Sequence, residues 1–216
     1  MMSKKERLSQ FNRNNIVTAA KELFAEKGVE QTTVDHIAKK ADCSKSTIYV
    51  YFKSKEEIFD CIVLEHYVML RDGLENATKD AENFSDGFYA ICNTVADFYA
   101  KHPMYFDSVL GEIKIVTDQS DPVLFQVYQV GEEINAIMAE FFVRWMNEGQ
   151  IRNDLPALPQ TIFALWGSVC GIISLAHKKR LYINYRMETT SEEFMKSGFD
   201  LLLKSVLPGV GGAENN

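Results

Sequence analysis

The side chains best suited to catalysis or metal binding are scattered along the chain. The four histidines and four cysteines follow no known catalytic or metal-binding spacing, and no G-x-S-x-G, P-loop or H-E-x-x-H sequence is present. Cys61, Glu65 and His66 could offer metal ligands, but their spacing matches no metal-site pattern. We therefore expect no enzymatic activity, no metal and no cofactor.

Residues 32–55 instead are rich in hydroxyl side chains, lysines and tyrosines. Among them lie two short segments whose apolar residues recur with helical period. The residues with helical period on either side of Asp42-Cys43 are Val34, Ile37, Ala38 and Ala41, then Ile48 and Phe52. Ser44 can cap the second of these helices. Two short helices joined by a tight turn predict a helix-turn-helix, with small residues in the first that let the second cross closely.

This segment resembles the TetR family of bacterial regulators, whose pattern reads approximately Thr-Thr-Val-x-x-Ile-Ala-x-x-Ala-Gly-Val-Ser-Lys-Gly-Thr-Leu-Tyr-x-Tyr-Phe-x-Ser-Lys-Glu. The clear resemblance covers about residues 12–65. The positions that keep the pattern are Thr32, Thr33, Val34, Ile37, Ala38, Ala41, Ser44, Lys45, Thr47, Tyr49, Tyr51, Phe52, Ser54, Lys55 and Glu56. Asp42-Cys43 replaces the usual Gly-Val, so the backbone of the turn must tolerate side chains. Ser46 and Val50 also depart from the pattern, so the operator sequence cannot be carried over.

The resemblance implies that the second helix of the motif lies in the major groove of double-stranded DNA. Lys45 and Ser46 are then the candidates for base contacts, because lysine donates to guanine O6 and N7. The side chains expected to contact phosphates are Thr33, Thr47, Tyr49, Tyr51 and Lys55. Tyr49 and Tyr51 point about 200° apart on a helix, so at most one of them can face the core.

Helical periodicity also fills the remainder of the chain, which predicts an all-α fold. Gly28 is the expected stop of a first helix, and Thr32 or Thr33 offers the next N-cap; with Thr32 as the cap, Asp35 would complete a capping box. Ser54 is the expected cap of a long helix that runs to about residue 77. Further helices are expected over about 84–101, 103–117, 121–148, 159–180 and 191–206. The sequence thus predicts a three-helix DNA-binding head (1–55), a larger helical ligand-binding and dimerisation body (56–207), and a disordered tail (208–216).

Charge separates the two predicted domains. The chain carries a net charge of -7, yet residues 1–55 hold eleven Lys/Arg against six Asp/Glu, giving +5, and the remaining residues carry -12. A basic head on an acidic body is typical of a DNA-binding domain joined to a regulatory body. Free cysteines without C-x-x-C spacing, and the absence of an apolar leader or a long apolar run, favour a cytoplasmic protein without a membrane segment.

The body resembles the family in architecture, which implies a homodimer and a small-molecule effector. Small residues on the helix near 159–180 would let a partner helix approach closely: Gly167, Ser168, Gly171 and Ser174. A monomer in which these glycines pack internally is the alternative. Glu65 shares a helix face with Cys61 and Met69, where it could orient a ligand or lie exposed at the rim. The ligand-binding candidates are Cys61, Glu65, Met69, Phe98, Phe106, Met138, Trp166 and Cys170.

We therefore expect a ligand-responsive DNA-binding transcriptional regulator. Repression is the expectation that the resemblance implies, with release from a palindromic operator by a mostly apolar molecule. The alternative is an all-helical ligand-binding or adaptor protein whose motif no longer reads a specific operator. The basic head and the Ser-Lys-Ser-Thr-Ile-Tyr sequence argue against this alternative.

Overall fold

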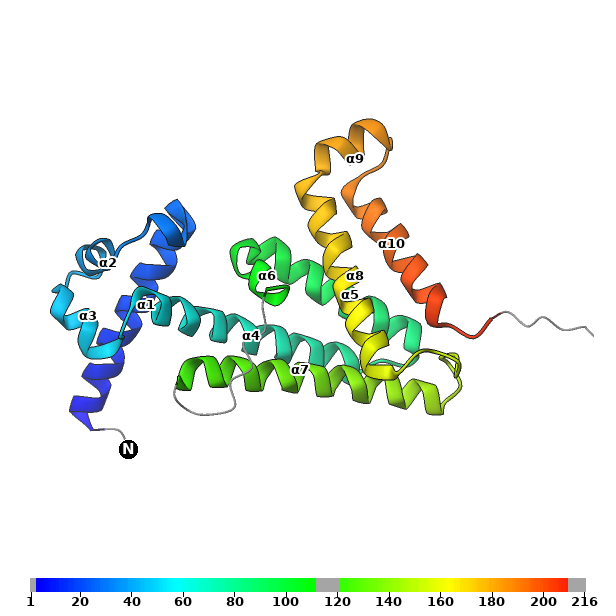
Figure 1. Cartoon of the computed structure of the whole chain (residues 1–216), viewed down its shortest axis with the longest axis horizontal. Coiled ribbons are helices and arrows are strands. Elements are labelled where there is room, and N and C mark those ends of the chain that lie inside the picture. The colour runs from blue at the N-terminus through cyan, green and yellow to red at the C-terminus, as the bar shows by residue number, and fades with distance from the viewer. Residues whose placement is uncertain (1–2, 112–120, 210–216) are drawn as a thin grey trace, which may run out of the picture. The chain divides into compact units, whose positions relative to one another are not determined.

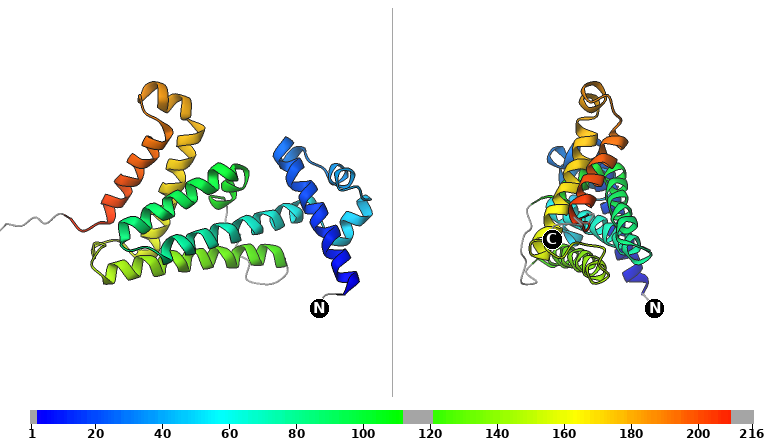
Figure 2. Two further views of the ribbon diagram at one scale, coloured as in Figure 1. Left: turned by 180° about the vertical axis from the view of Figure 1, so that it is seen from behind. Right: turned by 90° about the vertical axis from the view of Figure 1, so that its right-hand side faces the viewer.

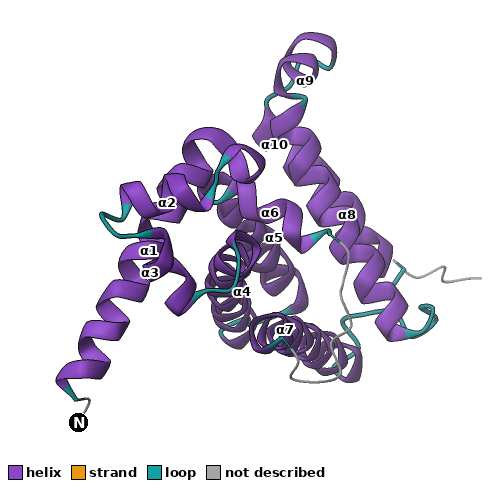
Figure 3. Cartoon of the chain, turned by 60° about the vertical axis from the view of Figure 1, so that its left-hand side comes forward, coloured by secondary structure: helices purple, strands orange, loops and turns teal. Residues whose placement is uncertain are grey.

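The computed structural model describes residues 3–111 and 121–209, and within them every regular element is a helix (Figure 3). The predicted all-α fold is confirmed. The helices, labelled as in Figure 1, are α1 Lys4–Gln31, α2 Val34–Lys40, α3 Lys45–Tyr51, α4 Lys55–Lys79, α5 Phe84–Lys101, α6 Pro103–Val109, α7 Pro122–Asn147, α8 Leu158–Lys178, α9 Arg180–Arg186 and α10 Ser191–Val206.

The described residues fall into two compact units. One unit gathers those within Met1–Tyr67 and Lys114–Gln129, and the other gathers those within Val68–Ile113 and Val130–Asn216. We call the first unit the head and the second the body, so the head includes residues 56–67, which the sequence assigned to the body. Helices α4 and α7 each contribute residues to both units. This division rests on compactness, whereas the predicted boundary after residue 55 concerns function and stays a prediction.

Helix α1 contributes a buried apolar face to the core of the head. It begins at a capping box, in which the Ser3 side chain accepts from the Glu6 N–H and the Glu6 carboxylate accepts from the Ser3 N–H. Gly28, the expected stop, interrupts the helix with a non-helical φ of 82°. The buried face is the one that the periodicity predicts, and comprises Ile16, Val17, Ala19, Ala20, Leu23 and Phe24.

The N-cap of α2 is Thr33. Its side chain accepts from the His36 N–H at 3.2 Å, and His36 completes the capping box at the third helical position. The box with Thr32 and Asp35 does not form, because Thr32 is buried and its hydroxyl donates to the Gly28 carbonyl at 2.8 Å. Ser44 and Ser54 cap α3 and α4 as expected, since each accepts a hydrogen bond from the N–H three residues on.

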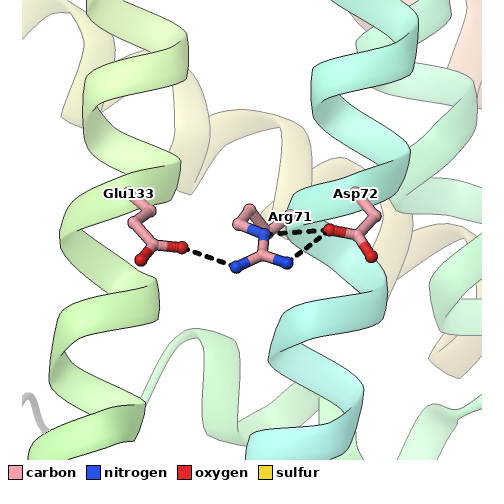
Figure 4. Close-up of polar contacts among 3 residues, drawn as sticks. All are labelled: Arg71, Asp72 and Glu133. Carbon is pink, nitrogen blue, oxygen red and sulfur yellow. Dashed lines mark hydrogen bonds and ion pairs between the residues drawn. The ribbon is translucent and has the colours of Figure 1, made fainter.

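The body is built around α8, which packs against α5 and α10. Helices α8, α9 and α10 form a hairpin with α9 at its bend (Figures 1 and 2). An aromatic cluster fills the core beside α5 and α7; its members are Phe84, Phe88, Phe141, Phe142 and Trp145. Arg71 on α4 also ties α4 to α7, because it donates to Glu133 at 2.6 Å while two further bonds hold it to Asp72 (Figure 4).

Two expected segments differ from the structure or lie beyond it. The helix expected over 103–117 ends at Val109 as α6, and residues 112–120 lie outside the described residues. The expected disordered tail lies outside them from residue 210 on. Helix α9 was not predicted; it exists because Lys179, at φ -112° and ψ 19°, ends α8 and the chain starts a new turn at Arg180.

Helix α8 has a largely exposed apolar surface within the single chain. Of the described helices it alone is long and apolar enough to cross a membrane, although the sequence offered no uninterrupted apolar run of that length. Only 22% of its most apolar window is buried. Core helices of soluble proteins meet the same criteria of length and composition. Because α8 is more exposed than a core helix, its apolar face is a candidate interaction surface.

Gly87 on α5 is the described glycine of the body at which an added Cβ would meet the closest neighbour, and it generates a first prediction. An added Cβ there would lie 2.5 Å from Phe141 and 2.8 Å from Ala81. Gly87→Ala is therefore expected to lower the free energy of unfolding by about 1–3 kcal/mol through overpacking. Thermal or urea unfolding measures the change.

Gly131 on α7 provides the matched control, because an added Cβ would meet no described atom within 4 Å. Gly131→Ala should stabilise the protein by about 0.5–1 kcal/mol through helix propensity alone. Equal effects of the two substitutions would contradict the packing described for Gly87.

Candidate nucleic-acid interface

The turn between α2 and α3 is fixed by bonds to carbonyls at the end of α2. The Cys43 N–H donates to the Ala38 carbonyl at 3.0 Å, and the Asn15 side chain on α1 donates to the Ala41 carbonyl at 2.7 Å. Asp42 has a φ of 50°, in the left-handed region that glycine favours. Aspartate is among the few other residues that adopt this conformation at modest cost, so the turn does tolerate side chains here.

The inner face of α3 is held firmly in the head. Ile48 and Phe52 are 0% and 2% exposed, and Ile37 of α2 is buried with them. The Arg13 guanidinium on α1 lies 4.9 Å from the centre of the Phe52 ring and donates to the Cys61 thiol at 3.1 Å. These contacts orient α3, so its opposite face is presented to solvent.

Hydroxyl groups and apolar side chains line that exposed face. The Ser44 hydroxyl lies 2.7 Å from that of Ser46 and 2.8 Å from that of Thr47. Ser46 is exposed and Thr47 half-buried, while Tyr49 is 51% and Val50 75% exposed. Exposed hydroxyls can contact phosphates or base edges, and an exposed valine can contact a thymine methyl group.

Lys45, at the first position of α3, has a partner on α2. Its Nζ lies 2.9 Å from Oδ2 of Asp35, in the first turn of α2, and both side chains are at least half exposed. The hydrogen bond and charge of Asp35 raise the pKa of Lys45. Thr33, exposed beside Asp35, uses its hydroxyl oxygen to cap α2. The ammonium group of Lys45 thus stays protonated and is held at the outer end of the helix pair.

The two tyrosines of α3 differ in their surroundings, as the helical spacing predicts. Tyr49 is exposed, whereas Tyr51 is half-buried and its hydroxyl accepts from the Asn12 side chain at 3.2 Å. Tyr51 therefore helps join α3 to α1. Tyr49 is half exposed, as a phosphate contact requires.

Lys55 has a structural bond that the sequence did not predict. Its ammonium group donates to the Val29 carbonyl at 2.8 Å, near the end of α1, and the residue is half-buried. The bond satisfies a carbonyl beside the kink at Gly28. Its expected phosphate contact stays a prediction.

The ligand-binding candidates are divided between the two units. In the head, Cys61 is buried against Arg13, and Glu65 forms an ion pair with Lys21 of α1 while half of its side chain stays exposed. In the body, the Phe98 and Phe106 rings lie 6.5 Å apart. The remaining candidates range from buried to half-exposed: Met138, Trp166, Cys170 and Met69.

Burial also determines what the Cys170 thiol can do. It raises the pKa of Cys170 to about 12, and burial does the same for Cys92. A thiol with such a pKa stays protonated at neutral pH. Cys170 can therefore offer a ligand an apolar contact, but not a thiolate.

The small residues proposed for the subunit contact share the outer side of α8. Gly167 and Ser168 are exposed, and Gly171 and Ser174 are half-buried. An added Cβ at either glycine would meet no described atom of the chain within 4 Å. Exposed large apolar side chains accompany them on the hairpin, and comprise Phe163, Leu175, Leu181, Tyr182, Tyr185 and Leu201.

Sequence reasoning missed three polar residues that build the interface. The sequence indicated Asp35 only as a cap, and it gave no signal for Asn12 or Asn15. Asparagines on a polar helix face carry no signal of their own, because their partners on α2 and α3 lie 26 or more positions away. The exposed acid opposite Lys45 could have been noticed only with α2 and α3 already crossed.

Comparison with known proteins agrees with this geometry. The family model described as bacterial regulatory proteins, tetR family, matches residues 16–62. The uncharacterized HTH-type transcriptional regulator YhgD of Bacillus subtilis is 25% identical over 134 residues, which cover 62% of this chain and 66% of that protein. The chain spans about half to two thirds of the length of the first curated relatives that it matches.

Two solved structures share the fold over most of their length. The fatty acid degradation regulator FadR from Bacillus halodurans aligns with a TM-score of 0.65 at 18% identity. The alignment covers 95% of this chain and 97% of the FadR chain. The transcriptional regulator FadR from Bacillus subtilis, solved in complex with stearoyl-CoA, gives 0.62 at 19% identity, with 88% and 96% covered. At these identities the likeness shows the fold alone.

The contrast between the tyrosines generates a second prediction. Tyr49→Phe removes one exposed hydroxyl and is expected to weaken binding to duplex DNA about three- to tenfold, with thermal stability unchanged, since a hydrogen bond contributes about 0.5–1.5 kcal/mol. Tyr51→Phe provides the comparison, because it also removes the bond to Asn12 and should therefore lower the melting temperature as well as the DNA affinity. Titration of fluorescent duplex DNA, with melting curves alongside, separates the two. Unchanged DNA affinity for Tyr49→Phe would refute the phosphate contact.

Proposed function

The chain belongs to the TetR family of bacterial regulatory proteins, and we propose that it is a homodimeric, cytoplasmic transcriptional regulator whose head binds a palindromic operator. Repression is the proposed mode, and a mostly apolar small molecule releases the DNA. The observation that carries the proposal is the exposed face of α3. Lys45, Ser46 and Tyr49 stand on it, and the buried Ile48 and Phe52 fix the helix from behind.

The charge of the chain supports DNA as the ligand of this face. The +5 of residues 1–55 attracts a polyanion, while the -12 of the remainder repels it. DNA is therefore drawn to residues 1–55. Lys45 and Ser46 are the proposed base contacts, and the proposed phosphate contacts are Thr33, Thr47, Tyr49, Tyr51 and Lys55.

Dimerisation is proposed to cover the outer side of α8. Gly167, Ser168, Gly171 and Ser174 allow a partner helix to approach closely, and the exposed Phe163 and Leu175 beside them supply apolar area. A two-fold dimer presents two heads to two half-sites, which explains why the operator is proposed to be palindromic.

The effector is proposed to bind in the body. The body contains the apolar side chains that line small-molecule sites, and its negative charge disfavours free nucleotides. One structural neighbour is a fatty acid degradation regulator and the other was solved in complex with stearoyl-CoA, so acyl compounds are the first probes. Helix α4 runs unbroken from Lys55 to Lys79 and thus joins the proposed DNA contact at Lys55 to Met69 of the body.

The third prediction tests DNA binding and dimerisation together. Wild-type protein should shift a duplex from upstream of its own gene in the presence of excess random DNA, and should sediment as a dimer at micromolar concentration. Gly167→Leu places a bulky side chain on the proposed contact, so both the dimer and the DNA complex should weaken by tenfold or more. The isolated fold should survive, because an added Cβ at Gly167 meets no described atom within 4 Å.

Gly131→Leu serves as the control for this experiment. Position 131 on α7 is equally open to a Cβ but lies outside the proposed contact. The control should leave sedimentation and DNA binding unchanged. A wild-type monomer, or equal effects of the two leucines, would overturn the proposed subunit contact.

The fourth prediction concerns the effector. Long-chain fatty acid or stearoyl-CoA should raise the melting temperature and lower operator affinity at least tenfold, which requires about 1.4 kcal/mol of coupling. Coenzyme A, ATP and zinc should have no such effect. Met69→Glu should abolish the response and keep DNA binding, whereas Val143→Glu, at a similarly exposed apolar site on α7, should keep both. Release of DNA by zinc or ATP alone would refute the apolar effector.

A further inference from the structure

The ion pair between Asp35 and Lys45 stands at the end of the helix pair that is proposed to meet DNA. Asp35 belongs to the first turn of α2 and Lys45 to the first turn of α3. Both helices are labelled in Figure 1. Nζ and Oδ2 lie 2.9 Å apart, and the two side chains are 50% and 67% exposed. A cation and an anion thus point outward side by side.

Stability does not explain this pair. An ion pair between exposed side chains contributes about 0–1 kcal/mol. The capping of α2 does not need the Asp35 side chain either, because Thr33 and His36 form the capping box. A carboxylate beside DNA repels phosphates, so its presence weakens binding to every sequence unless a base edge offers it a donor.

One base pair offers such a donor next to acceptors. In the major groove guanine presents the acceptors N7 and O6, and the cytosine paired with it presents the N4 amino donor. Guanine O6 and cytosine N4 are themselves joined by a hydrogen bond, whose ordinary length is about 2.9 Å. The distance between Nζ and Oδ2 is the same, so an ammonium donor and a carboxylate acceptor can face the two bases at once.

An A·T pair fits the two side chains less well. Its only amino donor, adenine N6, lies between two acceptors, adenine N7 and thymine O4. A carboxylate that accepts from N6 therefore also faces thymine O4, which repels it. The juxtaposition of Asp35 and Lys45 favours G·C over A·T through this repulsion as well as through attraction.

We propose that Asp35 and Lys45 together read one G·C base pair in each half-site, with Lys45 donating to guanine and Asp35 accepting from cytosine N4. This inference rests on the proposed DNA-binding function and adds Asp35 as a residue that determines specificity. Asp35 lowers affinity for all other sequences, and it also fixes the side chain of Lys45 before the groove is entered.

The experiment selects binding sites from a pool of random duplexes with the full-length protein. The proteins compared are the wild type, Asp35→Ala, Lys45→Ala and the double variant. Affinities are then measured for the selected duplex and for duplexes changed at each base pair in turn. Glu22→Ala is the matched control, because it removes an equal charge from another ion pair of the head, that with Lys40 at 2.6 Å, which does not involve α3.

The wild type should enrich one invariant G·C pair per half-site, and changing it to A·T should weaken binding about 5- to 100-fold. Asp35→Ala and Lys45→Ala should each lose most of this preference at the same base pair, and the double variant should lose little more. Asp35→Ala should bind random DNA more tightly than the wild type. Glu22→Ala should also tighten binding, but with the preference unchanged.

Three results would overturn the inference and leave the proposed function standing. They are an unchanged preference in Asp35→Ala, relaxation at different base pairs in the two single variants, and equal effects of Asp35→Ala and Glu22→Ala at every position. If the wild type enriches no sequence at all, the proposed function fails and this inference fails with it.

Discussion

Helices of seven residues are unstable by themselves in water, because the cost of nucleation exceeds what one or two turns return. Helices α2 and α3 are both of this length, so they depend on the apolar contacts beneath them. Ile37, Ile48 and Phe52 supply those contacts against the buried face of α1. Every feature proposed for DNA recognition follows from this packing, because it decides which side of α3 is buried and which is offered to a groove.

Polar contacts then refine what the packing fixes. Asn15 holds the end of α2, Arg13 lies on Phe52, and Lys55 bonds the end of α1. Each of these side chains has the chemistry to bind DNA, and each also makes a contact within the head. Lys45 is the one charged residue of α3, and its charge is matched by Asp35. Such a face suits reading of bases, while the net positive charge of residues 1–55 suits attraction of the duplex.

The sequence predicted the helices well because apolar residues recur with helical period on one face of each. It also indicated that Tyr49 and Tyr51, about 200° apart on the helix, cannot both face the core, but not which of them is exposed. It failed where a choice depends on neighbours distant in sequence. Thr33 caps α2 because the Thr32 hydroxyl is drawn to the Gly28 carbonyl, and Lys55 is engaged by Val29. Neither contact is visible in the spacing of apolar residues along the chain. Helix α9, of seven residues, is too short for that spacing to reveal it.

The central claim is that the exposed face of α3 lies in the major groove at two related half-sites. Dimethyl sulfate protection tests it directly, because the reagent methylates guanine N7 in the major groove and adenine N3 in the minor groove. On a duplex bound from upstream of its own gene, the wild-type protein should protect guanines in two clusters related by a two-fold centre, at a separation set by whole helical turns of about 10 base pairs. Protection of adenine N3 alone, or of guanines in a single cluster, would contradict the account.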